Sequence, residues 1–207
     1  MKQALVTMLT LQDRMNRKVH PQWISQNYEW FRAIWIECGE LIEHYGYKWW
    51  KKQTPDMPQV RLEVIDIWHF GLSALFVEGK PLAAIADEIV AALDGFDPSG
   101  DDVREATEAL AAYALNHRTV SVPLFWQLLH AAQLDFDELF RQYVGKNVLN
   151  LFRQDHGYKE GSYRKTWDGR EDNEHLVELM NALDASAADY ADRLYAALGE
   201  RYAALSA

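Results

Sequence analysis

Apolar residues recur three and four positions apart along almost the whole chain, which is the spacing of one face of an α-helix. Alternating strand patterns and Asn-Gly hairpin signals are absent, so the sequence predicts an all-α fold. We expect a bundle of about eight helices near residues 2–18, 27–45, 59–78, 81–94, 102–116, 122–132, 136–155 and 173–204.

One segment does not fit a helix. Residues 156–172 combine three glycines with aromatic and charged side chains. This composition is typical of a long ordered loop, and such loops often bind ligands. We expect the loop to be mobile without a ligand and ordered with one.

The length and composition favour one domain. A chain of 207 residues with 49% hydrophobic content can bury a large core. We therefore expect a single domain over residues 1–207, with 80–135 as a more mobile helical sub-region. The net charge of −10 argues against a nucleic-acid partner, which needs a clustered basic surface.

The chain carries no sign of a membrane or of an oxidising compartment. No apolar run approaches the ~20 residues of a membrane span, and the first residues lack a signal-peptide pattern. The single cysteine, Cys38, cannot form an internal disulfide. The sequence therefore predicts a cytoplasmic protein without a membrane partner.

Two pairs of acids stand out in apolar helices. Glu37 and Glu40 are three residues apart, and Glu63 and Asp66 repeat this spacing in the next expected helix. Each pair therefore lies on one helix face. Carboxylates among apolar residues lose hydration, and this costs several kcal/mol unless cations or donors compensate for it.

These carboxylates form a candidate metal site. Oxygen ligands without a Cys/His set favour Mg²⁺, with Mn²⁺ as the other candidate. Magnesium held by carboxylates usually meets substrate phosphates, which indicates phosphate-ester or phosphoanhydride chemistry. The alternative is a set of surface salt bridges.

A candidate phosphate-binding face follows later in the chain. Lys146, Asn150 and Arg153 share one helix face, and Tyr158 and Lys165 follow in the expected loop. A solvated polar face is the alternative reading.

Base recognition has weaker signals. Gln12 and Asn16 place two amides on one face of the first helix, and amides can read the edges of nucleobases. Trp49 offers an indole for stacking on a base. Taken alone, the amides fit a polar helix surface and the tryptophan a core position, and His69 fits a packed histidine.

The motifs LQDRMN, ECGE, KWWK and EVIDIWHF, together with the block GKNVLNLFRQDHGYKEGSYRKTWDGREDN, resemble the dimeric dUTPases of the all-α NTP pyrophosphatase superfamily. The resemblance covers the first ~80 residues and residues 143–176, whereas 80–140 shows only helical character. The departures are Asp13 and Arg14 beside the amides, and Tyr47 where relatives often have tryptophan.

The resemblance implies an enzyme that hydrolyses dUTP, and also dUDP, to dUMP with Mg²⁺. This activity would limit uracil in DNA and supply dUMP for dTMP synthesis. The resemblance assigns the residues as follows: Glu37, Glu40, Glu63 and Asp66 bind metal; Lys146, Asn150, Arg153, Tyr158 and Lys165 surround the phosphates; Gln12, Asn16, Trp49 and Asn173 read uracil; His69 and Phe70 pack against the deoxyribose. Glu37 and Glu40 would be catalytic, with Glu37 taking the proton of the attacking water.

The resemblance also implies a homodimer. The helices expected at 27–45 and 59–78 carry apolar residues on more than one face, as a two-fold interface would require. Two alternatives remain open. The first is a related dCTP/dUTP or other dNTP pyrophosphohydrolase, since side-chain amides can flip to serve either base. The second is a non-catalytic helical interaction module.

Overall fold

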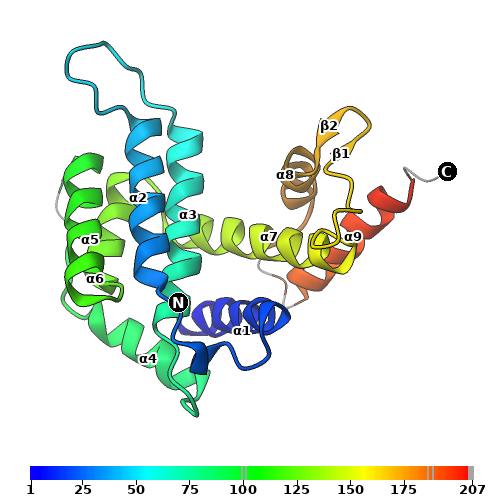
Figure 1. The fold of residues 1–207 in the computed structure, drawn as a ribbon, viewed down its shortest axis with the longest axis horizontal. Helices are drawn as coiled ribbons and strands as arrows, with labels where there is room; N and C mark the ends of the chain where they lie inside the picture. Colours follow the sequence, from blue (N-terminus) through cyan, green and yellow to red (C-terminus); the bar gives the residue numbers. More distant parts are fainter. Residues whose placement is uncertain (99, 101, 186, 188, 205–207) are drawn as a thin grey trace. The chain divides into compact units, whose positions relative to one another are not determined.

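The computed structural model describes residues 1–98, 100, 102–185, 187 and 189–204. Over these residues the chain is helical apart from one short hairpin, its loops and a 3-10 turn, η1 (Ile24–Gln26), which confirms the all-α prediction (Figure 1). The α-helices are α1 (Lys2–Val19), α2 (Trp30–Tyr45), α3 (Met57–Ala74), α4 (Leu82–Ala92), α5 (Val103–His117), α6 (Val122–Ala131), α7 (Phe136–Asp155), α8 (Asp172–Ala182) and α9 (Tyr190–Ala204).

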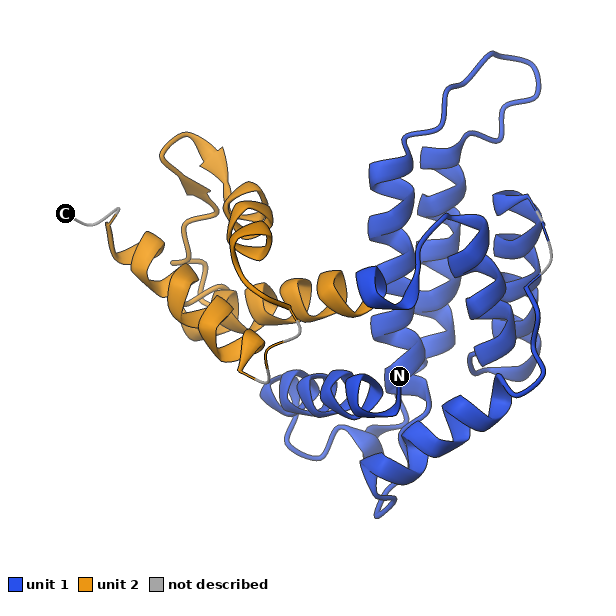
Figure 2. Ribbon diagram, turned by 180° about the vertical axis from the view of Figure 1, so that it is seen from behind, with its two compact units in different colours: residues 1–139 blue, residues 140–207 orange. Residues whose placement is uncertain are grey.

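The chain divides into two compact units, Met1–Leu139 and Phe140–Ala207 (Figure 2). Unit 1 contains α1 to α6 and the first turn of α7, and unit 2 contains the rest. The single domain and the greater mobility of residues 80–135 stay predictions. No helix among the described residues is both long and apolar enough to cross a membrane.

Unit 1 is built around α3. This helix packs against α2, to which residues 46–56 connect it, and also contacts α1 and α6 (Figure 1). Asp56 caps its first turn by accepting a hydrogen bond from the backbone N–H of Gln59. Nearly every side of α3 faces the core, and its buried apolar side chains are Val60, Val64, Ile65, Ile67, Trp68 and Leu72. Burial of each of these side chains stabilises the fold by roughly 1.5–3 kcal/mol. The polar residues of α3 therefore lie among apolar neighbours, with little access to water.

Unit 2 has a core of aromatic rings. Phe152 of α7 contacts the rings of Trp167 and Tyr202 at centroid distances of 6.0 and 5.5 Å. Gly145 allows α7 and α8 to approach, because a Cβ at this position would lie 2.3 Å from the sulfur of Met180. This part of α7 is therefore fixed against α8.

The C-terminal segment differs from the expectation in two places. Residues 156–172 are non-helical up to Glu171, as predicted, but they contain an antiparallel hairpin of β1 (Thr166–Trp167) and β2 (Arg170–Glu171). Its turn residues, Asp168 and Gly169, have φ values of 49° and 79°. The single helix expected at 173–204 is wrong: Leu183 is extended after α8, and α9 begins at Tyr190.

Candidate active site

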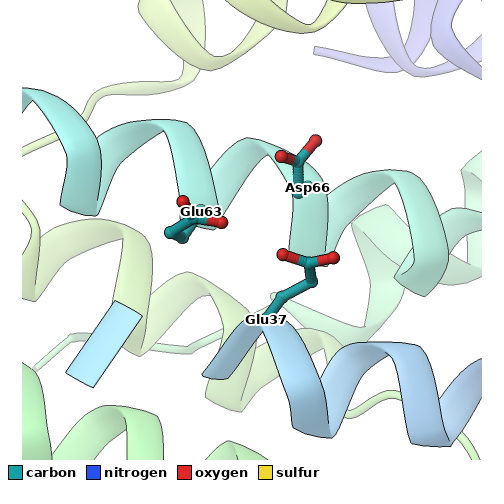
Figure 3. A group of neighbouring side chains, drawn as sticks. All are labelled: Glu37, Glu63 and Asp66. Carbon is teal, nitrogen blue, oxygen red and sulfur yellow. The ribbon is translucent and has the colours of Figure 1, made fainter. Parts of the chain in front are cut away.

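Three carboxylates meet between α2 and α3. Oxygens of Glu37, Glu63 and Asp66 all lie within 4.8 Å of one another (Figure 3). Glu37 extends from α2 toward the two acids of α3, which are one helical turn apart. Glu63 is buried, and Glu37 and Asp66 are half-buried. The predicted pairing of acids from two adjacent helices is therefore present for these three.

The electrostatics of this cluster favour a cation. Burial raises the pKa of Glu37 to about 8, with further contributions from its hydrogen bond to Glu63 and the charges of Asp66, Glu63 and Glu40. Without a cation, like charges at this distance cannot all remain ionised. The donor set is all oxygen, so the residues present fit Mg²⁺ or Mn²⁺.

Glu40 and His44 flank the three acids. Glu40 is exposed and lies outside the group whose oxygens converge, although its charge contributes to the raised pKa of Glu37. His44 was not predicted, and its Nε2 lies 3.6 Å from Oε1 of Glu63. The signal for His44 is its position seven residues after Glu37, which places both on one face of α2.

The two predicted amides lie in a buried hydrogen-bonded ring between α1 and α3. Gln12 Nε2 donates to Asn16 Oδ1 (3.1 Å), and Asn16 Nδ2 donates to Ser73 Oγ (3.0 Å). Ser73 Oγ donates to the backbone carbonyl of His69 (2.9 Å), and His69 Nδ1 lies 3.0 Å from Gln12 Oε1. Gln12, Asn16 and His69 are thus brought together, and Ser73 is a member that the sequence did not reveal.

An aromatic cavity adjoins this ring. It has a volume of about 380 Å³, and Ser73, Trp23, Trp30 and Phe76 are among its lining residues. Phe70 stacks on Trp30 with a centroid distance of 6.2 Å. The unusual Asp13 has a structural role, because it accepts hydrogen bonds from the indole of Trp23 (2.9 Å) and from Arg17 (2.8 Å).

Trp49 has no such packing. Its side chain is 91% exposed in the segment between α2 and α3, where its ring meets that of Trp50 edge to face. A core role for Trp49 in this chain is therefore wrong, and its indole is accessible to a ligand.

The predicted phosphate-binding residues belong to unit 2, where two of them, Asn150 and Tyr158, lie beside a third, Arg153. Its guanidinium forms two hydrogen bonds of 2.8 Å to the Asp172 carboxylate. Nη1 lies 3.4 Å from Asn150 Oδ1, and the Tyr158 ring centroid is 6.0 Å from Cζ. Asn173, predicted to read uracil, lies beside this group, with its Oδ1 3.5 Å from Nη2.

Asp172 is the residue that organises this group. It is fully buried and also accepts a hydrogen bond of 2.9 Å from the Tyr163 hydroxyl. Burial alone would raise the pKa of Asp172, but Arg153 and Tyr163 outweigh this effect and lower it. Sequence reasoning missed Asp172, whose only signal is an acid in the first turn of α8.

The two lysines of the predicted set lie in different parts of unit 2. Lys146 lies on α7 one turn before Asn150. The backbone carbonyl of Lys165 accepts the N–H of Asp172 (2.9 Å), while its side chain is exposed.

Residues 4–158 match the family model described as dUTPase. The chain belongs to the dUTPase family. This match confirms the resemblance and the prediction that the chain is an enzyme that hydrolyses dUTP. The matched residues include 80–140, where the motifs gave no signal. Lys165 and Asn173 of this dUTPase lie beyond the matched residues. No curated protein matches the chain at a significant level.

Proposed function

We propose that this dUTPase hydrolyses dUTP, and also dUDP, to dUMP in a reaction that depends on Mg²⁺, with Mn²⁺ able to replace it. The observation that carries the proposal is the meeting of three carboxylates from two apolar helices, with oxygens within 4.8 Å. Such a cluster is costly without a cation. The surface salt-bridge alternative explains the 3.6 Å approach of His44 Nε2 to Glu63 Oε1 but not why three acids meet.

The proposed metal ligands are Glu37, Glu63 and Asp66, with Glu40 as the fourth acid of the predicted set. A bound divalent cation would polarise the phosphoanhydride and lower the pKa of a bound water. Glu37 would accept the proton as the oxygen of water bonds to one phosphorus of the α,β-anhydride. The bond from this phosphorus to the α,β-bridging oxygen then breaks, and pyrophosphate leaves from dUTP, or phosphate from dUDP.

Recognition of the nucleotide is assigned to the other groups of residues. Gln12, Asn16, Trp49 and Asn173 would bind uracil, with His69 and Phe70 against the deoxyribose. The aromatic cavity beside Ser73 supports a base site near the two amides. Lys146, Asn150, Arg153, Tyr158 and Lys165 would surround the phosphates. The hydrogen bonds between Arg153 and Asp172 leave Nη1 as the nitrogen best placed for this role.

We also propose a cytoplasmic homodimer. Large apolar side chains remain exposed on the paired helices of unit 1, namely Trp35 and Ile36 on α2 and Leu62 on α3. Exposed apolar patches mark interaction sites, and we propose that these side chains form the dimer interface. The only cysteine, Cys38, is a buried thiol whose pKa burial raises to about 12, so it is inert and suited to a reducing compartment.

The test compares hydrolysis of dUTP, dUDP, dCTP, dTTP and UTP at equal concentration, each with Mg²⁺, with Mn²⁺ and with EDTA. We expect release of dUMP from dUTP and dUDP, little reaction with the others, and none in EDTA. Equal rates for dUTP and dTTP would refute uracil recognition. Full activity in EDTA would refute the metal site, and equal rates for dUTP and dCTP would favour the related dCTP/dUTP pyrophosphohydrolase.

A further inference from the structure

We infer that Ser73 is a positioning residue that fixes the orientation of the Gln12 and Asn16 amides and thereby the preference for uracil over cytosine. The inference rests on the proposed base-binding role of these amides. It starts from the closed ring of hydrogen bonds through Gln12, Asn16, Ser73 and His69.

The Ser73 hydroxyl has a single proton, and its position is determined by its neighbours. Oγ lies 2.9 Å from the carbonyl oxygen of His69, which can only accept. Two oxygens at this distance repel unless a proton lies between them, so the hydroxyl proton points to the carbonyl. Towards Asn16, at 3.0 Å, Oγ must then accept, so Asn16 presents its NH₂ group.

The orientation of Asn16 determines the orientation of the remaining groups in the ring. With its NH₂ facing Ser73, Asn16 turns its oxygen to Gln12, which must donate from Nε2 at 3.1 Å. The oxygen of Gln12 then faces Nδ1 of His69 at 3.0 Å, so this nitrogen carries the proton of the neutral ring. One hydroxyl therefore sets the orientation of two amides and the tautomer of one imidazole.

Burial makes the arrangement cooperative. All four side chains lie in the core of unit 1, and none is more than 9% exposed. Flipping one amide would place N–H against N–H or oxygen against oxygen, with no bulk water to compensate. Without the Ser73 hydroxyl, both amides could flip together, because the imidazole can change tautomer at the other end of the chain.

The orientation of an amide decides which pyrimidine it can bind. Uracil presents the O4 acceptor and the N3–H donor, whereas cytosine presents the N4 amino group and the N3 acceptor at the same positions. An amide that flips serves both patterns, and an amide of fixed orientation serves one. Ser73 thus removes the flip that would otherwise give a dCTP/dUTP enzyme.

The test substitutes Ser73→Ala and measures kcat/KM for dUTP and dCTP. We expect the ratio of the two values to fall by about tenfold, which is the effect of one net hydrogen bond. Ser73→Thr, which keeps the hydroxyl, should retain the ratio. Ser73→Cys, with a weak donor of similar volume, should reduce it and serves as the second variant if the alanine variant does not melt cooperatively.

Thr107→Val is the matched control. The buried Thr107 hydroxyl also donates to the carbonyl four residues earlier, at 2.6 Å from the oxygen of Val103, but it lies on α5, away from the ring. Loss of this bond should leave the dUTP/dCTP ratio unchanged.

A second measurement is independent of activity. ¹⁵N NMR of the His69 ring, assigned with a His69 variant and recorded where the ring is neutral, should show only the Nδ1–H tautomer in the wild type and both tautomers in Ser73→Ala. An unchanged ratio with a single tautomer in Ser73→Ala would overturn the inference. A wild type that shows no dUTP preference would instead overturn the proposed base recognition. The NMR result would still show whether Ser73 fixes the orientation of the hydrogen-bonded ring.

Discussion

The buried ion pair between Arg153 and Asp172 leads to a quantitative prediction about stability. Asp172→Asn removes the negative charge but keeps the shape of the side chain. The new amide can no longer accept both guanidinium hydrogen bonds, which are 2.8 Å long in the native pair. Its NH₂ group would face donors of Arg153, so a buried cation would lose its partner.

The magnitude follows from burial. The Asp172 side chain is 1% exposed and that of Arg153 is 14% exposed. Breaking a buried pair by removing one partner costs about 3–5 kcal/mol, and the partial access of water to Arg153 favours the lower end. We therefore expect a loss of about 3 kcal/mol, or a decrease in Tm of roughly 6–12 °C.

Urea unfolding of the wild type, Asp172→Asn, Arg153→Met and the double variant provides the assay. The loss of unfolding free energy in the double variant should be about 2 kcal/mol smaller than the sum of the two single losses, because neither charge is left buried without its partner. Glu178→Gln is the matched control: Arg170 and Arg201 lower the pKa of Glu178 to about 2, but this group is exposed, so the loss should be much smaller. Additive single effects, or a loss in Asp172→Asn no larger than in Glu178→Gln, would refute the reasoning.

The pair also predicts the acid side of the stability profile. Because the pKa of Asp172 is lowered in the folded protein, its contribution is present above the ordinary aspartate value of 3.8 and is lost as the pH falls below it through the native pKa. Asp172→Asn should therefore flatten the dependence of the unfolding free energy on pH in this acidic range. The same slope in wild type and variant would contradict the lowered pKa.

Three further predictions concern the active site and its surroundings. Asp66→Asn should reduce kcat at least roughly 100-fold, because it removes a proposed metal ligand. The Tm of the metal-free protein should not fall, because the change relieves repulsion with Glu37 and Glu63, and a lowered Tm would indicate a structural ion pair instead. Glu43→Gln, at an exposed acid of the same helix pair, is the control and should remain active. Hydrogen exchange across residues 156–171 should slow on addition of Mg²⁺ and a non-hydrolysable dUTP analogue. Unchanged exchange would refute the prediction that the ligand orders this loop. Sedimentation should give a dimer at micromolar concentration and a monomer for Ile36→Glu, whereas Val177→Glu, at another exposed apolar residue, should remain dimeric; a monomeric wild type would refute the interface.

The helices of unit 1 could be predicted because periodicity and caps agree there. The expected range 59–78 begins two residues after α3 begins and ends four residues beyond its end, and Asp56 with Pro58 provides a clear start. The acids of α2 and α3 could be paired because these two apolar helices follow each other in the chain, and consecutive elements are usually adjacent in space. Which acids converge depends on how the helices pack, and the sequence does not contain this information for Glu40.

The C-terminal region was harder to predict because its decisive signals are short. Asp168 and Gly169 form a two-residue turn with positive φ, a hairpin signal equivalent to Asn-Gly, but it is flanked by strands of only two residues. The break between α8 and α9 lies in a sequence rich in alanine, whose helical propensity is high. Asp172 looks like a common first-turn acid, and only the fold reveals its pairing with Arg153, nineteen residues earlier.

The polar residues of α3 explain why metal binding and base recognition would be linked. A helix buried on nearly all sides must compensate each polar group, and those of α3 lie in two places: Glu63 and Asp66 meet Glu37, where a bound cation would compensate them, and Ser73 with His69 meets the amides of α1. Asp66 and Ser73 are seven residues apart, which is about 10 Å along the helix axis. This separation is of the order of a nucleoside with its α-phosphate. Because one continuous helix carries both groups, a base held at the Ser73 end would place the phosphate near the carboxylates, so that a misplaced base would also misplace the bond to be broken.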